Sequence, residues 1–118
     1  MAFHFCSHAW EVRDMQDGML IRLSPRDLDP DTVAVIVDEL FELVQESGQT
    51  RLYLDLADIR QIASVVMGKL LALDARLREH GGQLILLDLN PFPYETLQAA
   101  RLTEILDIRI KESAETLF

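Results

Sequence analysis

The chain is poor in cysteine and in long apolar runs, and each shortage excludes a class of protein. Cys6 is the only cysteine, so no intrachain disulfide can form, and we expect a reducing, cytoplasmic environment. No apolar run approaches the roughly 20 residues that a membrane-spanning helix needs, and the first residues lack the basic start and apolar stretch of a signal peptide. Neither secretion nor membrane insertion is therefore expected.

Positive charge is also scarce. The 11 Lys and Arg residues stand against 20 Asp and Glu residues, which gives a net charge of −9, and the cations form no dense stripe along the sequence. Binding to a nucleic-acid backbone depends on clustered positive charge, so nucleic acid is not the expected ligand. The acidity fits simple solubility or a protein partner with a basic face.

Residue patterns for catalysis, cofactors and metals are missing as well. No Gly-Lys-Ser/Thr segment follows a strand, so Gly81-Gly82 is not a phosphate cradle. His4, Cys6 and His8 would share one strand face, but three ligands without a fourth indicate chance rather than a metal site. The carboxylates that could pair, with no nucleophile motif beside them, are Asp55, Asp58, Asp74 and Asp88. We expect Asp55 and Asp88 to be structural, and the protein to be neither an enzyme nor a cofactor binder.

The sequence does contain a regular alternation of strand and helix patterns. Strand patterns at 9–13 and 19–23 flank Asp17-Gly18, a strong turn signal, and predict an antiparallel hairpin. The pair Asp29-Pro30 is typical of a helix N-cap followed by the first helical residue. An apolar period of three and four residues then predicts an amphipathic helix over 30–47, with an acidic outer face.

The second half of the chain continues the alternation. The predicted elements are a buried strand at 52–56, a helix at about 65–80 that ends at Gly81, a buried strand at 84–87, a short helix at 94–100 after a breaker at 90–93, and a last strand at 105–110. This order predicts a single α/β domain over residues 1–118. Its mixed sheet would have parallel central strands, covered by the amphipathic helices.

Five segments in this order carry a resemblance to a known family. Residues 26–29 keep the Leu-Asp half of a Gly-Glu-Leu-Asp element, 54–56 read Leu-Asp-Leu, and 62–68 fall on an Asp-Ser-Ser-Gly stretch. Residues 78–84 and 100–106 resemble a Gly-Gly pattern and a leucine pattern that precede later strands. Together they resemble the STAS domain, the fold shared by bacterial anti-sigma factor antagonists and the cytoplasmic domains of sulphate transporters.

The resemblance implies that Ser64 is a phosphoacceptor, because it falls on the serine that the antagonists have phosphorylated. Ala63 stands where the family has an acidic residue, and Val65 and Val66 replace a small Ser-Gly pair. A phosphate at a helix head would lie near unsatisfied N–H groups and would add roughly 1.5 to 2 negative charges to a partner surface. The alternative is that Ser64 serves only as an N-cap, and spacing leaves both roles open.

By the same resemblance, the partner is an anti-sigma factor with serine-kinase activity, bound through the loop 57–63 and the head of the second helix. The expected contact residues are Asp58, Arg60, Gln61, Ala63, Val65, Met67 and Lys69. Val66 lies on the periodic apolar face and is expected in the core, whereas Val65 lies off that face. The alternative function is an accessory subunit of a transport ATPase, docked through the same loop and helix without a phosphorylation cycle.

Overall fold

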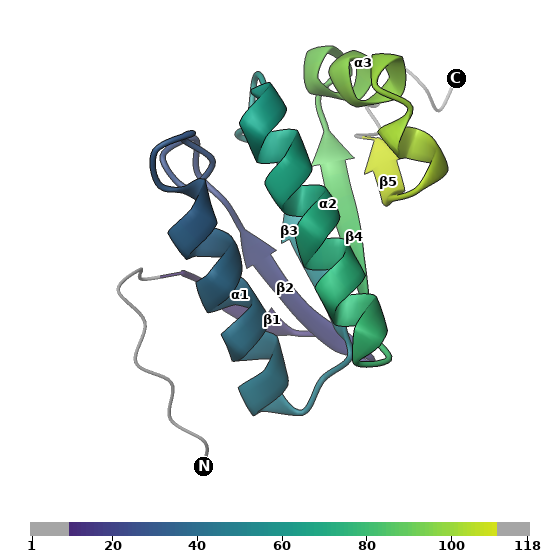
Figure 1. Cartoon of the computed structure of the whole chain (residues 1–118). Helices are drawn as coiled ribbons and strands as arrows, with labels where there is room; N and C mark the ends of the chain where they lie inside the picture. The colour runs from purple at the N-terminus through teal and green to yellow at the C-terminus, as the bar shows by residue number, and fades with distance from the viewer. Residues whose placement is uncertain (1–9, 111–118) are drawn as a thin grey trace, which may run out of the picture.

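The computed structural model describes residues 10–110, and strands and helices alternate along them (Figure 1). The elements are β1 (Val12–Asp14), β2 (Gly18–Arg22), α1 (Val33–Ser47), β3 (Arg51–Asp55), α2 (Ser64–Glu79), β4 (Gln83–Leu89), α3 (Pro91–Ala99), the 3-10 turn η1 (Leu102–Glu104) and β5 (Asp107–Ile110). This is the predicted order, with several boundaries shifted by a few residues.

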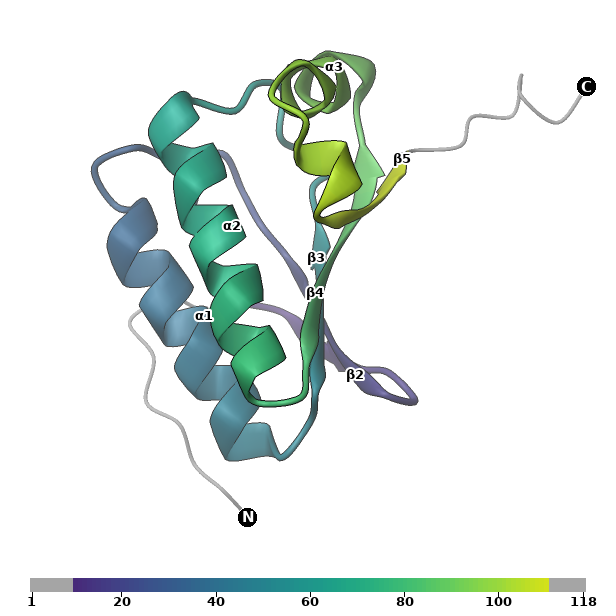
Figure 2. The ribbon, with the colours of Figure 1, turned by 45° about the vertical axis from the view of Figure 1, so that its right-hand side comes forward.

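The strands form one sheet in the order β1-β2-β3-β4-β5, so each strand lies beside its predecessor in the chain. β1 is antiparallel to β2, and all other neighbours are parallel. Because every parallel crossover steps the same way across the sheet, α1 and α2 pack side by side on one face (Figures 1 and 2). The predicted α/β fold, with parallel central strands covered by helices, is confirmed.

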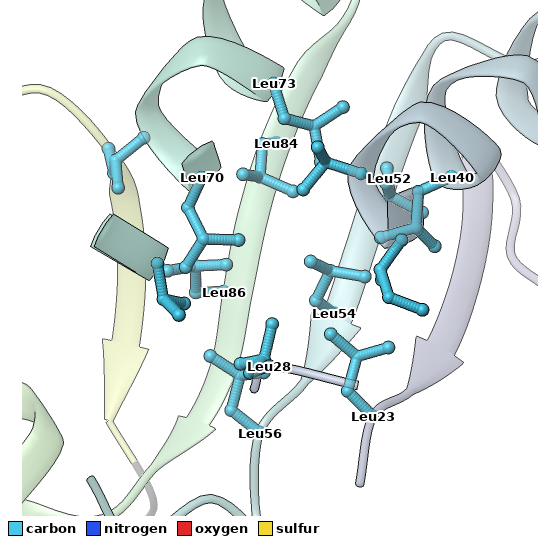
Figure 3. Close-up of a cluster of buried hydrophobic side chains, with 14 of the residues drawn as sticks. Leu23, Leu28, Leu40, Leu52, Leu54, Leu56, Leu70, Leu73, Leu84 and Leu86 are labelled. Atoms are coloured by element: carbon cyan, nitrogen blue, oxygen red, sulfur yellow. The ribbon is translucent and has the colours of Figure 1, made fainter. Parts of the chain in front are cut away.

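The core lies between this face and the helices, and leucine dominates it (Figure 3). Alternate strand residues point toward the helices in register, so that Ile21, Leu54 and Leu86 form a fully buried row across the sheet. The helices contribute the stripes Val33, Ile36, Val37, Leu40 and Val44 from α1 and Val66, Leu70, Leu73 and Leu77 from α2. Each such side chain contributes roughly 1.5–3 kcal/mol when buried, so this layer determines the fold.

The first helix begins later than the Asp29-Pro30 pair predicts. Its first residue is Val33, and its N-cap is Thr32 rather than Asp29. The Asp29 carboxylate instead accepts the backbone N–H of Asp31 at 2.9 Å, which closes an Asx turn. The Asp29 carbonyl accepts the N–H groups of Thr32 and Val33, so a separate turn precedes the helix. A local side-chain bond has therefore displaced helix initiation.

The last elements are also shifted from their predicted positions. α3 begins at Pro91, so the segment 90–93 starts a helix instead of breaking the chain. Proline fits the first helical turn because the N–H that it lacks would have no partner within the helix there. Conversely, the turn η1 occupies Leu102–Glu104, and β5 begins only at Asp107.

Two adjacent glycines follow α2, and the first of them, Gly81, ends the helix as predicted. Gly81 has a φ of 81°, the left-handed conformation that favours glycine, and the N–H of Gly82 bonds to the Leu77 carbonyl at 2.7 Å. A Cβ atom on Gly82 would collide with the carbonyl oxygen of Thr50. The first glycine therefore closes the helix, and the second allows β4 to start close against β3.

A buried carboxylate on α2 is the main feature of the core that apolar periodicity does not predict. Asp74 is only 2% exposed. One of its oxygens accepts the Leu84 N–H at 3.1 Å, and the other accepts the Arg78 Nε–H at 2.8 Å. The side chain therefore joins α2 to the start of strand β4.

We expect Asp74→Ala to lower the free energy of unfolding by about 1–3 kcal/mol, because it leaves the buried Leu84 N–H without its acceptor. Asp38→Ala is the matched control, since Asp38 pairs with Arg76 at the surface, where such pairs contribute about 0–1 kcal/mol. Chemical denaturation of both variants measures the difference. Equal stabilities for the two variants would contradict the structural role assigned to Asp74.

Candidate functional site

Three loops meet at one edge of the sheet, because parallel strands end at the same side. They are the β2–α1 loop, the β3–α2 loop and the β4–α3 connection, and we call their common surface the loop edge. It contains a groove of about 660 Å³, lined by Pro25, Leu28, Asp29 and Pro30 from the first loop, residues 59–63 from the second, and Phe92 and Thr96 from α3. We call this the loop groove. Several segments that are distant in sequence thus form one surface next to the start of α2.

Ser64 is exposed at this edge, as the first residue of α2. The N-cap is Ala63, whose carbonyl accepts the Met67 N–H at 3.0 Å, and no side chain caps the helix. The interpretation of Ser64 as the N-cap is therefore wrong by one position. Its hydroxyl lies at the positive end of the helix dipole, with no hydrogen-bond partner among the residues that the structure describes.

The residues that follow Ser64 divide between core and surface as predicted. Val66 is fully buried, whereas Val65 is 47% exposed beside the serine. Met67 is half-buried and packs against the core. Lys69 is also half-buried and follows Val65 by four residues, so the two share a side of the helix. Val65 therefore presents more surface to a partner than Met67 or Lys69 does.

The β3–α2 loop is held by side chains on both sides of it. The Arg22 guanidinium donates two hydrogen bonds of 3.0 Å to the two oxygens of Asp58. On the other side, the Asn90 amide donates to the carbonyls of Ala57 at 2.8 Å and Ile59 at 3.0 Å. The loop that leads to Ser64 is thus fixed to β2 and to the start of α3.

The Arg22–Asp58 pair affects the charge of this edge as well as the rigidity of the loop. The hydrogen bonds that Arg22 donates to Asp58, together with the negative charges of Asp58 and Asp55, raise the pKa of Arg22 above its usual value. Both side chains of the pair are about half exposed, at 55% and 49%. The charge of Asp58 at the surface is therefore balanced by Arg22. Arg60 and Gln61 follow in the same loop, are exposed and line the groove.

The other carboxylates do not form a catalytic pair with these residues. Asp55 accepts the Ala57 N–H at 2.9 Å, which confirms its structural role at the end of β3. Asp74 is buried at α2, and Asp88 has a φ of 58° within the bulged end of β4. Within residues 10–110 no cluster of His, Cys, Asp and Glu could hold a metal ion, and the His4–Cys6–His8 pattern lies outside them.

The sequence did not point to Arg22 or Asn90, although both position the loop. Arg22 reads as an exposed strand residue, and Asn90 as part of a chain breaker. Only the parallel register, which places Arg22 opposite Asp55 and near Asp58, brings these residues together.

None of the helices in the described range is long and apolar enough to cross a membrane.

One family model matches most of the chain. A family model described as "Mlab, STAS domain" matches residues 12–108. No curated protein matches the chain. The NMR structure of TM1081, a protein of Thermotoga maritima, superposes with a TM-score of 0.78 at 18% identity, covering 92% of this chain and 86% of that one.

Two further solved structures are similar. An anti-sigma-factor antagonist (STAS) domain protein from Planctomyces limnophilus has a TM-score of 0.68 at 20% identity, covering 92% of this chain and 94% of that one. The anti-sigma factor antagonist SpoIIAA in its unphosphorylated form has a TM-score of 0.68 at 19% identity, covering 92% of both chains. At such identities the likeness to these structures shows the fold alone.

We expect Asn90→Ala to loosen the β3–α2 loop, because two loop carbonyls lose their donor. A loss of about 1–2 kcal/mol in local stability corresponds to roughly 5- to 30-fold faster amide hydrogen exchange over residues 57–63. Gln98→Ala, an exposed position on the same helix, is the control and should leave that exchange unchanged. If exchange over 57–63 is the same in the Asn90 variant and the control, Asn90 does not position the loop.

Proposed function

Because the matched family model covers residues 12–108, the chain belongs to the STAS domain family, and from this premise we propose that it is a non-enzymatic regulator that acts as an anti-sigma factor antagonist does. Its partner is an anti-sigma factor with serine-kinase activity, and its place of action is the cytoplasm. The chain resembles anti-sigma factor antagonists in fold as well as in sequence pattern.

One observation carries this proposal: the hydroxyl of Ser64 is exposed at the uncapped head of α2, beside the loop groove. A kinase needs such an accessible hydroxyl, and a partner needs a rigid surface around it. The bonds from Arg22 and Asn90 to the β3–α2 loop provide that rigidity. The contact residues of the proposed interface are Asp58, Arg60, Gln61, Ala63, Val65, Met67 and Lys69.

A switch at this position requires that a phosphate leaves the fold intact but disrupts the interface with the partner. A phosphate on the first residue of α2 would lie near free backbone N–H groups and the positive end of the helix dipole, so the fold accommodates it. The same phosphate would place about two negative charges and a hydrated group in the middle of a docking surface. The unmodified protein would bind its partner, and the phosphorylated protein would release it.

We expect incubation with the cognate kinase and ATP to add one phosphoryl group to the wild-type protein and none to Ser64→Ala, as measured by intact mass. We also expect Ser64→Asp to weaken partner binding by roughly tenfold or more, because the added charge lies inside the interface. Thermal unfolding is the control, since an acidic residue in the first helical turn keeps or slightly raises helix stability. No added phosphate, together with full binding by Ser64→Asp, would rule out the switch.

A second candidate function is an accessory subunit of a transport ATPase, docked through the same loop and helix without phosphorylation. The observation that favours it is the apolar surface of Val65 beside Ser64, where a small residue would suit a reversible switch better. Co-purification with a membrane ATPase, unaffected by Ser64→Asp, would decide for this candidate. Co-purification with a kinase-fold regulator, abolished by the same substitution, would decide against it.

A further inference from the structure

The sheet ends in two edge strands, β1 and β5 (Figure 1). Within residues 10–110 each of them has a strand neighbour on one side only, so part of its backbone N–H and C=O groups point outward. Such an edge is a template for a strand of another chain, unless its side chains oppose the pairing. The side chains of each edge strand therefore decide whether it can pair and with what.

The side chains of β5 alternate between charged and apolar. Ile108 lies opposite Leu86 of β4 and packs against the core, so it points to the helix side of the sheet. Ile110 points to the same side but is 55% exposed. Asp107 and Arg109 point to the opposite face, because successive side chains of a strand alternate between faces. One face of this edge is thus apolar, and the other carries one charge of each sign.

An antiparallel pair of two β5 strands, centred on Ile108, matches both faces. Ile108 then lies opposite Ile108 of the second copy, and Asp107 lies opposite Arg109. Because the arrangement is twofold symmetric, the cross-strand pair of opposite charges forms twice. The exposed Ile110 of each copy comes to lie opposite Leu106 of the other. Opposite charges and apolar pairs in these positions stabilise a sheet.

The neighbouring registers are less favourable. A register centred on Asp107 sets two carboxylates opposite each other, and one centred on Arg109 sets two guanidinium groups opposite each other. A shift by a single residue would bring the apolar face of one copy to the charged face of the other. The sequence of β5 therefore favours one register with a second copy of itself.

The other edge strand is less suited to pair with itself. β1 has three residues, one fewer than β5. A register centred on Val12 would also set Glu11 opposite Arg13, but it would set the carboxylate of Asp14 opposite the half-buried Trp10. In β5 the corresponding place is filled by the apolar pair of Leu106 and Ile110.

Asp107 and Arg109 also contact each other within one chain. Their closest charged atoms are 3.4 Å apart, and the side chains are 32% and 57% exposed, so this pair contributes little to stability. Residues two apart on one strand are separated by about 6.5 Å along it. Residues directly opposite on paired strands have Cβ atoms about 4.5–5.5 Å apart. Arg109 of a second copy is therefore the better placed partner for Asp107.

We propose that the chain forms a twofold dimer through antiparallel pairing of β5 with β5 of a second copy. The pairing joins two five-stranded sheets into one. Because the paired strands run in opposite directions, the two loop edges, each with its Ser64, lie at opposite ends of the joined sheet. The dimer thus uses none of the residues around Ser64, and it does not depend on the proposed function.

Analytical ultracentrifugation of the full chain over a range of concentrations measures this association. We expect a concentration-dependent dimer for the wild type. Arg109→Asp and Asp107→Arg should each raise the dissociation constant of the dimer roughly tenfold or more, because each sets like charges opposite each other at both pairs. Arg13→Asp makes the same charge change on the other edge strand and is the matched control. It should dimerise as the wild type does.

An equimolar mixture of Arg109→Asp and Asp107→Arg tests the register itself. One variant then presents two carboxylates and the other presents two guanidinium groups, so we expect a heterodimer with about the affinity of the wild-type dimer. If the contact of Asp107 with Arg109 mattered only within one chain, mixing would restore nothing, because both variants lack that contact.

Four results would overturn the proposal: a monomer at every concentration, a dimer that neither β5 variant weakens, equal weakening by Arg13→Asp, or no recovery on mixing. Circular dichroism of every variant separates loss of pairing from loss of fold. The proposed function fails by a different result, the absence of phosphate transfer to Ser64, which does not involve β5. The two failures are therefore distinguishable.

Discussion

The parallel pairing of β2, β3 and β4 is the constraint on which the rest of the structure depends. Its register aligns Ile21, Leu54 and Leu86 in one buried row, and the apolar stripes of α1 and α2 close over the sheet. Figure 3 shows Leu40 of α1 and Leu70 and Leu73 of α2 beside the leucines of β3 and β4. A slip of one residue would turn this row away from the helices. Because the strands are parallel, the same register brings the ends of all three to one edge, where the loops meet.

That edge differs from the rest of the molecule in rigidity and in charge. Arg22 and Asn90 fix the β3–α2 loop from two sides, so contacts within the chain hold the loop that leads to Ser64. Within residues 10–110, Arg26 and Arg60 at this edge form no ion pair, whereas six other arginines do. The net charge of −9 is therefore not spread evenly over the surface of the protein.

The sequence predicts the fold well because buried leucines and valines recur with the period of each element. It predicts boundaries poorly where a local bond competes, as in the Asx turn of Asp29 that delays α1. The sequence also does not predict the structural role of Asp74, because its hydrogen-bond donor, the Leu84 N–H, lies beside it only in the folded chain. For the site, periodicity separates exposed Val65 from buried Val66, but the groove and the role of Asn90 arise from loops that meet only after folding.

The central claim is that the loop edge around Ser64 is where this protein touches its partner. A photo-reactive amino acid placed at position 92 in the full chain, expressed in its native cells, tests it most directly. The account predicts a cross-link to one protein from position 92, its loss when Ser64→Asp is added, and none from position 79 at the opposite end of α2. Cross-links from position 79 but not from position 92 would contradict the account.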